Sequence, residues 1–394
     1  MQKPKTLILK KNEDRRILAG HLWIYSNEID PKFTPLKNFS AGDLVEIESS
    51  NHKTLGIGYI NPNTLLCTRI LSRIPCSIDQ NFFAIKIKSA LAIRERCFAE
   101  PYYRLVFSEA DFLPGLIIDR FNDVFVIQLN TAGIYRGKPF IVDALVAEFN
   151  PRAIVIKNSG IAQLEGLPLE VEIAHGILPP TINVVENGLQ FVMEIEHGQK
   201  TGWFFDQRVN RAAIWRYVKN KRVLDVFSYV GAFGVGAATH GATEVICIDS
   251  SEKALALIHE NAALNNVASL VQTKAADAFA ALKQLAESKE LFDVIILDPP
   301  AFIKKQKDLK MGTEAYLRLH ELALKILAPH GILCTTSCSL HFTRDLLLDV
   351  VRKAALHSKR ETRILEQLHQ APDHPMHPAI AETNYLKGFC IAVN

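Results

Sequence analysis

Apolar stretches of two kinds alternate through the second half of the chain. Short runs rich in Val, Ile and Leu occupy 222–227, 243–249, 270–277, 292–298 and 331–337. Between them, stretches with apolar residues at helical spacing occupy 230–241, 251–265, 278–288, 312–327 and 343–356. Strands that alternate with helices of this length predict an α/β fold, a parallel sheet with helices on both faces and right-handed crossovers. Two further strand-like runs follow at 361–368 and 385–393.

The first 185 residues follow two other patterns. Strand-like runs separated by Gly, Asn, Pro and Ser occupy 6–10, 43–49, 54–60 and 65–71, which predicts a small β-barrel-like module. A helical stretch that begins near Ser77 and Asp79 comes next, and it is followed by strand-like runs at 113–121, 123–130 and 152–158 and a helix at 138–149. This part predicts a mixed α+β unit, and Pro179–Pro180 suits a boundary. We therefore expect three domains, at 1–73, 74–185 and 186–394.

The composition and the distribution of charge bear on the kind of partner that the protein binds. The chain has 394 residues, of which 48% are hydrophobic and 22% charged, enough for well-packed cores. The net charge of +3 is small, but residues 1–75 hold eleven Lys or Arg against seven Asp or Glu. A basic N-terminal module fits contact with nucleic-acid phosphates, and an ordinary solvated surface is the alternative.

The seven cysteines contain no C-x-x-C pair and no cluster with His, which argues against a disulfide framework and against a structural metal. A reducing compartment follows, so we expect a cytoplasmic protein. The N-terminus lacks an apolar segment of signal-peptide length, and no window of about 18 apolar residues predicts a membrane span.

In an open α/β sheet, ligands bind beyond the carboxyl ends of the strands. The first such end carries Gly231 and Gly234, where backbone can approach a ligand closely, and Asp249 ends the next strand, where a carboxylate can accept ribose hydroxyls. This pair fits nicotinamide dinucleotides and S-adenosylmethionine equally, although a full G-x-G-x-x-G is missing. A tight turn with a capping Asp is the plain alternative. Asp277 ends the third strand, where it fits an adenine amino group or a helix cap.

The fourth and fifth strand ends carry more specific chemistry. Asp298 is followed by Pro299 and Pro300, which make a stiff corner that fixes the carboxylate. Cys338 lies just past the fifth strand, and in the sheet order expected for this fold these two strands are neighbours. A thiolate there can attack C6 of a pyrimidine and make C5 nucleophilic. Cys247 and Cys334, inside strands, are expected to be inert packing residues.

These segments, taken in order, resemble the bacterial large-subunit ribosomal RNA (cytosine-5)-methyltransferase family. The resemblance covers nearly the whole chain. It rests on 20–29 and 56–71 (similar to the family's PUA domain), 112–121 (central domain), and on 196–211, LDVFSYVGAFG, LDPPAF, TTSCS and DHP…YLKGF. It implies an N-terminal PUA domain, a central α+β domain and a class I (Rossmann-like) methyltransferase domain.

The resemblance also implies a reaction and its residues. S-adenosylmethionine would be the donor and a cytidine of 23S-type rRNA the acceptor, with Cys338 as nucleophile toward C6 and Asp298 binding N3 and N4 of the base. The implied cofactor-binding residues are Lys200, Thr201, Arg208, Asp225, Phe227, Ser228, Gly231, Phe233, Asp249, Ser250, Asp277 and Asp298. The target base would be splayed out of its stack to reach the donor. A homodimer is compatible with the sequence.

One departure keeps other functions open. Many RNA cytosine-5 enzymes carry a second cysteine after the fourth strand, where this chain has Pro299-Pro300-Ala301, so the sequence names no base for the C5 proton. Asp-Pro-Pro also resembles the corner of amino-group methyltransferases, which leaves guanine or adenine N-methylation as an alternative. A non-catalytic RNA-binding protein that keeps the donor fold is a third reading, and an oxidoreductase a distant fourth. Four lysines in 303–310 suit RNA phosphates or a solvated loop.

Overall fold

The computed structural model describes residues 4–169, 171–195, 198 and 201–394. The chain forms two compact units. The first comprises Met1–Ile182, Glu194–Phe205 and Pro372–Asn384, and the second comprises Asn183–Met193, Asp206–Ala371 and Tyr385–Asn394. Within the described ranges, no helix is both long enough and apolar enough to cross a lipid bilayer.

The first unit begins with a five-stranded sheet in the order β1-β3-β4-β5-β2. Its strands are β1 (Lys5–Ile8), β2 (Trp23–Tyr25), β3 (Asp43–Glu48), β4 (Thr54–Ile60) and β5 (Leu66–Ser72), with the short helix α1 (Arg15–Leu18) between the first two. The four runs that the sequence pattern predicts are all strands. The sequence pattern did not predict β2, because three residues are too few to show an alternation of apolar and polar positions.

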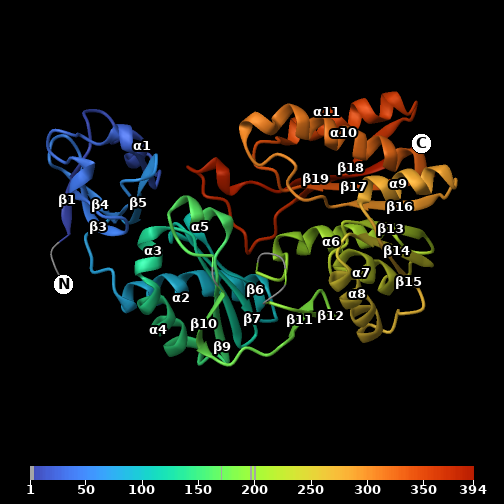
Figure 1. Ribbon diagram of the computed structural model, residues 1–394, viewed down its shortest axis with the longest axis horizontal. Coiled ribbons are helices and arrows are strands. Elements are labelled where there is room, and N and C mark those ends of the chain that lie inside the picture. The colour runs from blue at the N-terminus through green and yellow to red at the C-terminus, as the bar shows by residue number, and fades with distance from the viewer. Residues whose placement is uncertain (1–3, 170, 196–197, 199–200) are drawn as a thin grey trace. The chain divides into compact units, whose positions relative to one another are not determined.

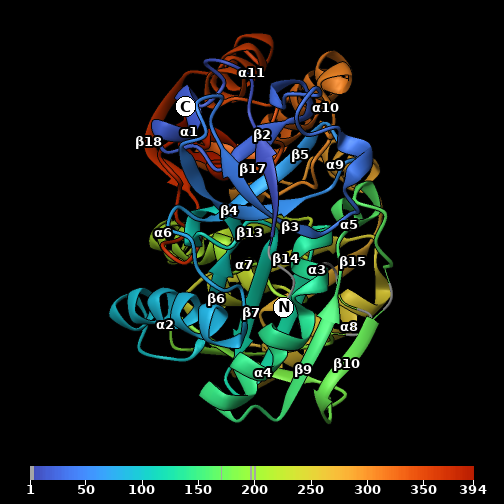
Figure 2. The same cartoon turned by 90° about the vertical axis from the view of Figure 1, so that its left-hand side faces the viewer.

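A second five-stranded sheet, in the order β10-β9-β8-β7-β6, completes the first unit (Figure 2). Its strands are β6 (Tyr102–Phe107), β7 (Leu116–Phe121), β8 (Val124–Leu129), β9 (Ala153–Lys157) and β10 (Val171–Gly176), and its helices are α2 (Gln80–Cys97), α3 (Ala132–Arg136), α4 (Lys138–Phe149) and α5 (Gly160–Leu164). The predicted cap of the long helix is confirmed, since the Asp79 carboxylate accepts the Phe82 N–H at 3.0 Å. The tight turn at Asn122, with φ of 57°, joins β7 to β8.

The second unit holds a seven-stranded sheet in the order β15-β14-β13-β16-β17-β19-β18. Its strands are β13 (Arg222–Val226), β14 (Glu244–Asp249), β15 (Val271–Ala275), β16 (Phe292–Leu297), β17 (Leu327–Ser337), β18 (Thr362–His369) and β19 (Lys387–Val393). The five strands from β15 to β17 are parallel, as the alternating pattern predicts.

The last strand departs from the parallel arrangement of the sheet. β19 runs antiparallel to both of its neighbours, β17 and β18. A parallel neighbour needs a crossover connection that is usually a helix, whereas the chain between β18 and β19 contains only the short 3-10 helix Ala381–Thr383. The chain therefore returns at the same end of the sheet and runs back between β17 and β18.

Helices cover both faces of this sheet, as predicted. They are α6 (Arg208–Ile214), α7 (Ala232–Thr239), α8 (Glu252–Leu264), α9 (Ala278–Glu287), α10 (Leu309–Ile326) and α11 (Arg344–His357). In Figure 1, α7 and α8 lie on one side and α10 and α11 on the other. The hairpin of β11 (Ile182–Glu186) and β12 (Leu189–Met193) precedes the sheet and bonds to α8 through Asn261, whose amide binds both the N–H and the C=O of Val192.

Candidate active site

Asp225, at the carboxyl end of β13, is a fully buried carboxylate. Its Oδ2 atom accepts the Gly234 N–H at 2.9 Å. Among the described residues, its Oδ1 atom has no hydrogen-bond partner. Burial raises the pKa of Asp225 to about 7, against the lowering effect of the Gly234 N–H, and the negative charges of Asp298 and Asp249 raise it further. A buried carboxylate with an open oxygen suits a cationic ligand group.

The loop that follows Asp225 is held in an unusual backbone conformation. Phe227, Tyr229 and Gly231 have φ values of 66°, 49° and 82°. Left-handed backbone is costly for aromatic residues, and such strain concentrates at binding sites. The hydroxyl of Ser228 is buried and, in the described part of the chain, has no hydrogen-bond partner. Phe233, the second residue of α7, is buried with the Arg211 guanidinium 5.6 Å from its ring centre.

Asp249, at the end of β14, uses both carboxylate oxygens to fix the backbone of this loop. Its Oδ2 accepts the Tyr229 N–H and its Oδ1 accepts the Ser251 N–H, both at 2.9 Å. Each oxygen of a carboxylate can accept a second hydrogen bond, so a ribose hydroxyl remains a possible partner. Ser250 is exposed beside it. Asp277, at the end of β15, caps α9 by accepting the Ala280 N–H at 3.0 Å and is exposed.

Asp298, at the corner after β16, is held by two donors that the sequence pattern did not reveal. Its Oδ1 accepts hydrogen bonds from the Gln207 amide at 2.8 Å and from the Thr336 hydroxyl of β17. Asn210 of α6 in turn donates to the Oε1 of Gln207 at 2.6 Å. The carboxylate therefore belongs to a polar network that orients it. Gln207 lies within the 196–211 segment, but a single Gln in that segment gives no signal of such a role.

Cys338 is half-buried at the end of β17, unlike the cysteines inside the strands. The hydroxyls of its neighbours Ser337 and Ser339 are buried and bond to the Tyr316 hydroxyl of α10 at 2.8 and 3.1 Å. Cys334, as expected, is sealed in the sheet interior beside Cys390.

An aromatic group lies around the corner after β16. The ring of Phe302 is 4.9 Å from Tyr316, 6.1 Å from Phe279 and 6.4 Å from Phe227, centre to centre. Tyr316 is buried, whereas Phe227, Phe279 and Phe302 are each partly exposed, so these three rings can present apolar faces to a planar ligand. Of this group, only Phe227 was predicted from the sequence, because lone aromatic residues in helices and loops ordinarily signal packing.

The segment 196–211 divides between the two units. Lys200 lies outside the described residues. Thr201, in the first unit, is buried, and its hydroxyl has no hydrogen-bond partner within the described ranges. Arg208, in the second unit, pairs with the buried Glu186 of β11, its Nε atom 3.4 Å from Oε2. The same carboxylate binds Arg211. The roles of Lys200, Thr201 and Arg208 in binding the cofactor remain predictions.

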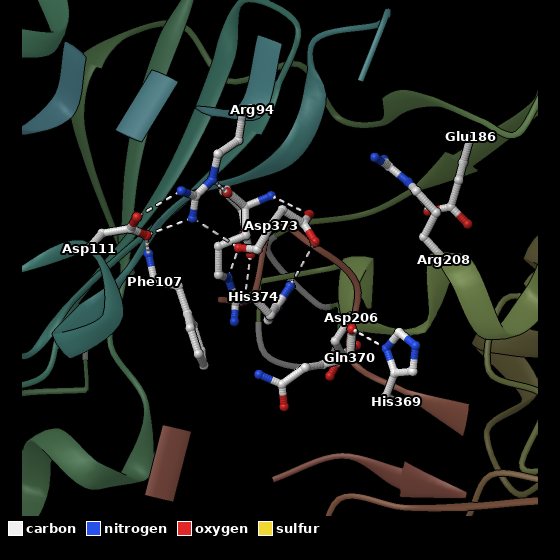
Figure 3. A network of polar contacts seen from close by, with 12 residues as sticks. Arg94, Phe107, Asp111, Glu186, Asp206, Arg208, His369, Gln370, Asp373 and His374 are labelled. Atoms are coloured by element: carbon white, nitrogen blue, oxygen red, sulfur yellow. Dashed lines mark hydrogen bonds and ion pairs between the residues drawn. The ribbon is translucent and has the colours of Figure 1, made fainter. Parts of the chain in front are cut away.

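The DHP motif belongs to the first unit, where it joins a buried polar network (Figure 3). The guanidinium of Arg94 binds both oxygens of Asp111, at 2.7 and 2.6 Å, and the main-chain oxygen of Asp373 at 3.0 Å. The Asp373 carboxylate accepts the Arg104 N–H and the Nδ1 atom of His374, each at 2.9 Å. These contacts give the motif a structural role in anchoring Pro372–Asn384.

The sheet order and the carboxylates along its carboxyl edge define a class I S-adenosylmethionine-dependent methyltransferase. A family model described as S-adenosylmethionine-dependent methyltransferase matches residues 170–387, and one described as a PUA-like domain matches residues 7–73. The solved structure of SMU.776 complexed with SAH has the same fold, with a TM-score of 0.84 and 22% identity over 98% of this chain and 100% of that one.

Curated relatives narrow the class to a family. The proteins named ribosomal RNA large subunit methyltransferase I from Tolumonas auensis and Shewanella frigidimarina are each 38% identical to this chain, over 98% of this chain and 98% of theirs. The chain therefore belongs to the ribosomal RNA large subunit methyltransferase I family, and its methyl donor is S-adenosylmethionine. The resemblance inferred from the sequence motifs is confirmed. The domain boundaries 1–73, 74–185 and 186–394 remain predictions.

Proposed function

We propose that the protein transfers a methyl group from S-adenosylmethionine to carbon 5 of a cytidine in large-subunit ribosomal RNA, with Cys338 as the nucleophile. The names of the relatives support this RNA as the substrate. The observation that carries the assignment is the half-buried thiol of Cys338 at the end of the strand next to the one that ends in Asp298.

The register of the two strands supports a shared face for the thiol and the carboxylate. Leu297 of β16 pairs with Thr335 of β17, and the next residue, Thr336, donates to Asp298. Side chains two residues apart in extended chain point to the same side. Cys338 follows Thr336 by two, whereas Ser337 and Ser339 point to Tyr316. The alternation thus favours a Cys338 thiol on the Asp298 side, about 7 Å further along the chain.

The proposed reaction uses the thiolate as a temporary substituent. The sulfur of Cys338 forms a bond to C6 of the cytosine, and the C5–C6 electron pair becomes available at C5. C5 then bonds to the methyl carbon as the bond between that carbon and the sulfonium sulfur breaks, which leaves S-adenosylhomocysteine. A base takes the C5 proton, and the electron pair of that C–H bond restores the double bond while the S–C6 bond breaks and its electron pair returns to the sulfur of Cys338. Asp298, oriented by Gln207 and Thr336, accepts a hydrogen bond from the N4 amino group of the base. When it carries a proton it donates to N3, and in that form it stabilises the negative charge that develops on the ring.

The residues at the end of β13 fit the donor. S-adenosylmethionine supplies an electrophilic methyl group and carries a cationic amino group on its methionine end. Among the described residues, the Oδ1 atom of Asp225 and the hydroxyl of Ser228 have no hydrogen-bond partner. Both can accept hydrogen bonds from the amino group of the methionine end. Asp249 suits the ribose, Asp277 the adenine amino group, and Gly231 leaves room for close approach of the loop. A homodimer stays compatible with the sequence.

Four exposed lysines follow the Asp298 corner. Lys304, Lys305, Lys307 and Lys310 are all solvent-exposed on and around the start of α10. Exposed ammonium groups next to a reactive edge suit contact with RNA phosphates, whose affinity then falls with rising salt. We propose that this loop helps to hold the RNA around the target base.

The test is a methyl-transfer assay on ribosomal RNA from a strain that lacks this enzyme, with tritiated donor and nucleoside mass analysis. Wild type should produce 5-methylcytidine, and Cys338→Ala should lose at least about 1000-fold in rate, since a covalent step is removed. Cys76→Ala, at an exposed cysteine, is the matched control and should keep full activity.

Each other result has a defined meaning. Undiminished 5-methylcytidine formation by Cys338→Ala removes the thiol from the mechanism. An N-methylated guanosine or adenosine as product points to the alternative in which the Asp298-Pro299-Pro300 corner alone positions an amino group. Absence of donor binding by calorimetry leaves only an RNA-binding role.

A further inference from the structure

Lys387, the first residue of β19, is a buried lysine next to the proposed nucleophile. It pairs with Ser337 across the antiparallel β17–β19 ladder, one residue before Cys338. Only 6% of Lys387 is exposed. Its ammonium group donates to the main-chain oxygen of Ser339, one residue after Cys338, and to that of Tyr385 at 2.8 Å. The ladder pair with Ser337 and the hydrogen bond to Ser339 thus place Lys387 against the main chain on either side of Cys338.

The charge of Lys387 has no carboxylate partner in the part of the chain that the structure describes. Both of its acceptors are neutral carbonyl groups. Burying an unpaired ammonium is costly, and structures keep such groups mainly where the charge has a use. Burial lowers the pKa of Lys387 to about 8, a negative charge on Cys338 raises it, and the nearby Arg344 lowers it. An electrostatic effect is mutual, so the cation acts equally on the sulfur.

Two other cysteines of the same sheet show how burial changes the pKa of a thiol. Burial raises the pKa of Cys247 and of Cys334 well above the ordinary range for a thiol. A buried position in this sheet therefore disfavours a thiolate. Reactive thiolates in proteins occur beside Lys, Arg or protonated His. Cys338 differs from Cys247 and Cys334 in being half-buried and in having the ammonium group of Lys387 bonded to the main chain one residue further on.

We propose that Lys387 is a positioning residue whose ammonium group holds Cys338 in its thiolate form for attack on C6 of the target base. The inference rests on the proposed function of Cys338. Lys387 acts through the sulfur and the flanking carbonyl of Ser339, and it forms no bond to the substrate.

The test measures the thiolate directly rather than through methylation. Wild type, Lys387→Met, Lys387→Arg and Lys325→Met are alkylated with iodoacetamide across pH 5.5 to 10, and each cysteine is followed by peptide mass spectrometry. Lys325 is exposed on α10 at the start of β17, far along the strand from Cys338, so it is the matched control. The exposed Cys76 and Cys97 serve as internal references.

Lys387→Met should move the half-maximal pH of Cys338 alkylation upward by about one unit, which is about tenfold less thiolate at a given lower pH. Lys387→Arg should keep most of the wild-type behaviour, and Lys325→Met all of it. An unchanged midpoint in Lys387→Met overturns the inference. An upward shift of the midpoint in Lys387→Arg as large as that in Lys387→Met also overturns it, because Arg keeps the positive charge. The effect would then come from the shape of the lysine side chain and not from its charge. The methyl-transfer assay of Cys338→Ala decides the proposed function separately.

A reciprocal measurement serves if Lys387→Met fails to fold. In Cys338→Ser, the titration of Lys387, followed by NMR of ¹³C-labelled lysine side chains, should have a lower midpoint than in wild type, since the negative charge that raises it is gone. An identical midpoint in both proteins would show that sulfur and ammonium do not interact.

Discussion

The side-chain amide of Gln207 donates a hydrogen bond of 2.8 Å to the Oδ1 atom of Asp298. It joins the residue just before α6 to the corner after β16, two points 91 residues apart in the sequence. Gln207 is itself fixed by Asn210, which donates to its Oε1 atom at 2.6 Å. The carboxylate proposed to bind the cytosine is thus oriented from outside its own loop.

Loss of this orientation should slow the reaction without loss of donor binding. Gln207→Leu removes the donor to Asp298 while it keeps the volume of the side chain, so the carboxylate can rotate. We expect kcat to fall about 10- to 100-fold, because small misplacements of a catalytic group cost factors of this size. Steady-state kinetics on ribosomal RNA and calorimetry with S-adenosylmethionine measure the two quantities.

A second glutamine provides the control for this change. Gln284, on the exposed side of α9, contacts Lys274, and Gln284→Leu should leave kcat and donor affinity unchanged. Equal kcat in Gln207→Leu and wild type would show that Thr336 alone suffices to orient Asp298.

The raised pKa of Asp225 predicts a pH dependence of donor binding. Below about pH 7 the donor-free protein holds Asp225 protonated. The cationic amino group of S-adenosylmethionine favours the ionised form, so binding there must release a proton. The dissociation constant should therefore increase by up to about tenfold for each pH unit below 7. Calorimetry in buffers of different ionisation enthalpy measures both affinity and proton release.

Asp225→Asn supplies the comparison, with weaker binding that does not vary with pH in this range. The same shift predicts the opposite trend for the stability of the donor-free protein. Because the folded protein retains a proton that the unfolded chain loses near 3.8, the stability that Asp225 contributes decreases as the pH rises from 3.8 to about 7. Urea unfolding at pH 5 and pH 8 should show a smaller difference in Asp225→Asn than in wild type.

Periodicity revealed the main architecture because long elements repeat their pattern many times. The five parallel strands and the helices between them follow the alternation of Val- and Ile-rich runs with helical stretches, and carboxyl-end positions follow from that order. The hairpin of β11 and β12, by contrast, is too short to show such a repeat, and its sequence signal is the Asn187–Gly188 turn, with φ values of 52° and 79°.

The roles of individual side chains were harder to predict for a physical reason. Asp249 and Asp298 could be recognised because they directly follow strands. Gln207, Thr336 and Lys387 could not, because their contacts come from chain segments that meet only in three dimensions. The antiparallel direction of β19, which sets Lys387 opposite Ser337, is also absent from the local pattern, since period-two alternation carries no direction.

Gly234 should tolerate no side chain. A Cβ atom there would lie 2.5 Å from the sulfur of Cys247 and 3.1 Å from Oδ2 of Asp225. Gly234→Ala is therefore expected to destabilise the second unit by about 1–3 kcal/mol through overpacking and to weaken donor binding at least tenfold. Gly160→Ala, where a Cβ would meet nothing within 4 Å, should change stability by less than about 0.5 kcal/mol. Wild-type donor affinity in Gly234→Ala would contradict the packing argument.

The ion pair of Arg94 and Asp111 should dominate the stability of the first unit. Arg94 has no exposed surface and binds both oxygens of Asp111, so Arg94→Met leaves a buried carboxylate without its partner. Breaking such a pair costs about 3–5 kcal/mol. The exposed pair of Lys353 and Asp349 is the control, where Lys353→Met should leave the free energy of unfolding nearly unchanged. Urea unfolding at neutral pH measures both, and equal losses in the two variants would mean that burial does not strengthen the Arg94 pair.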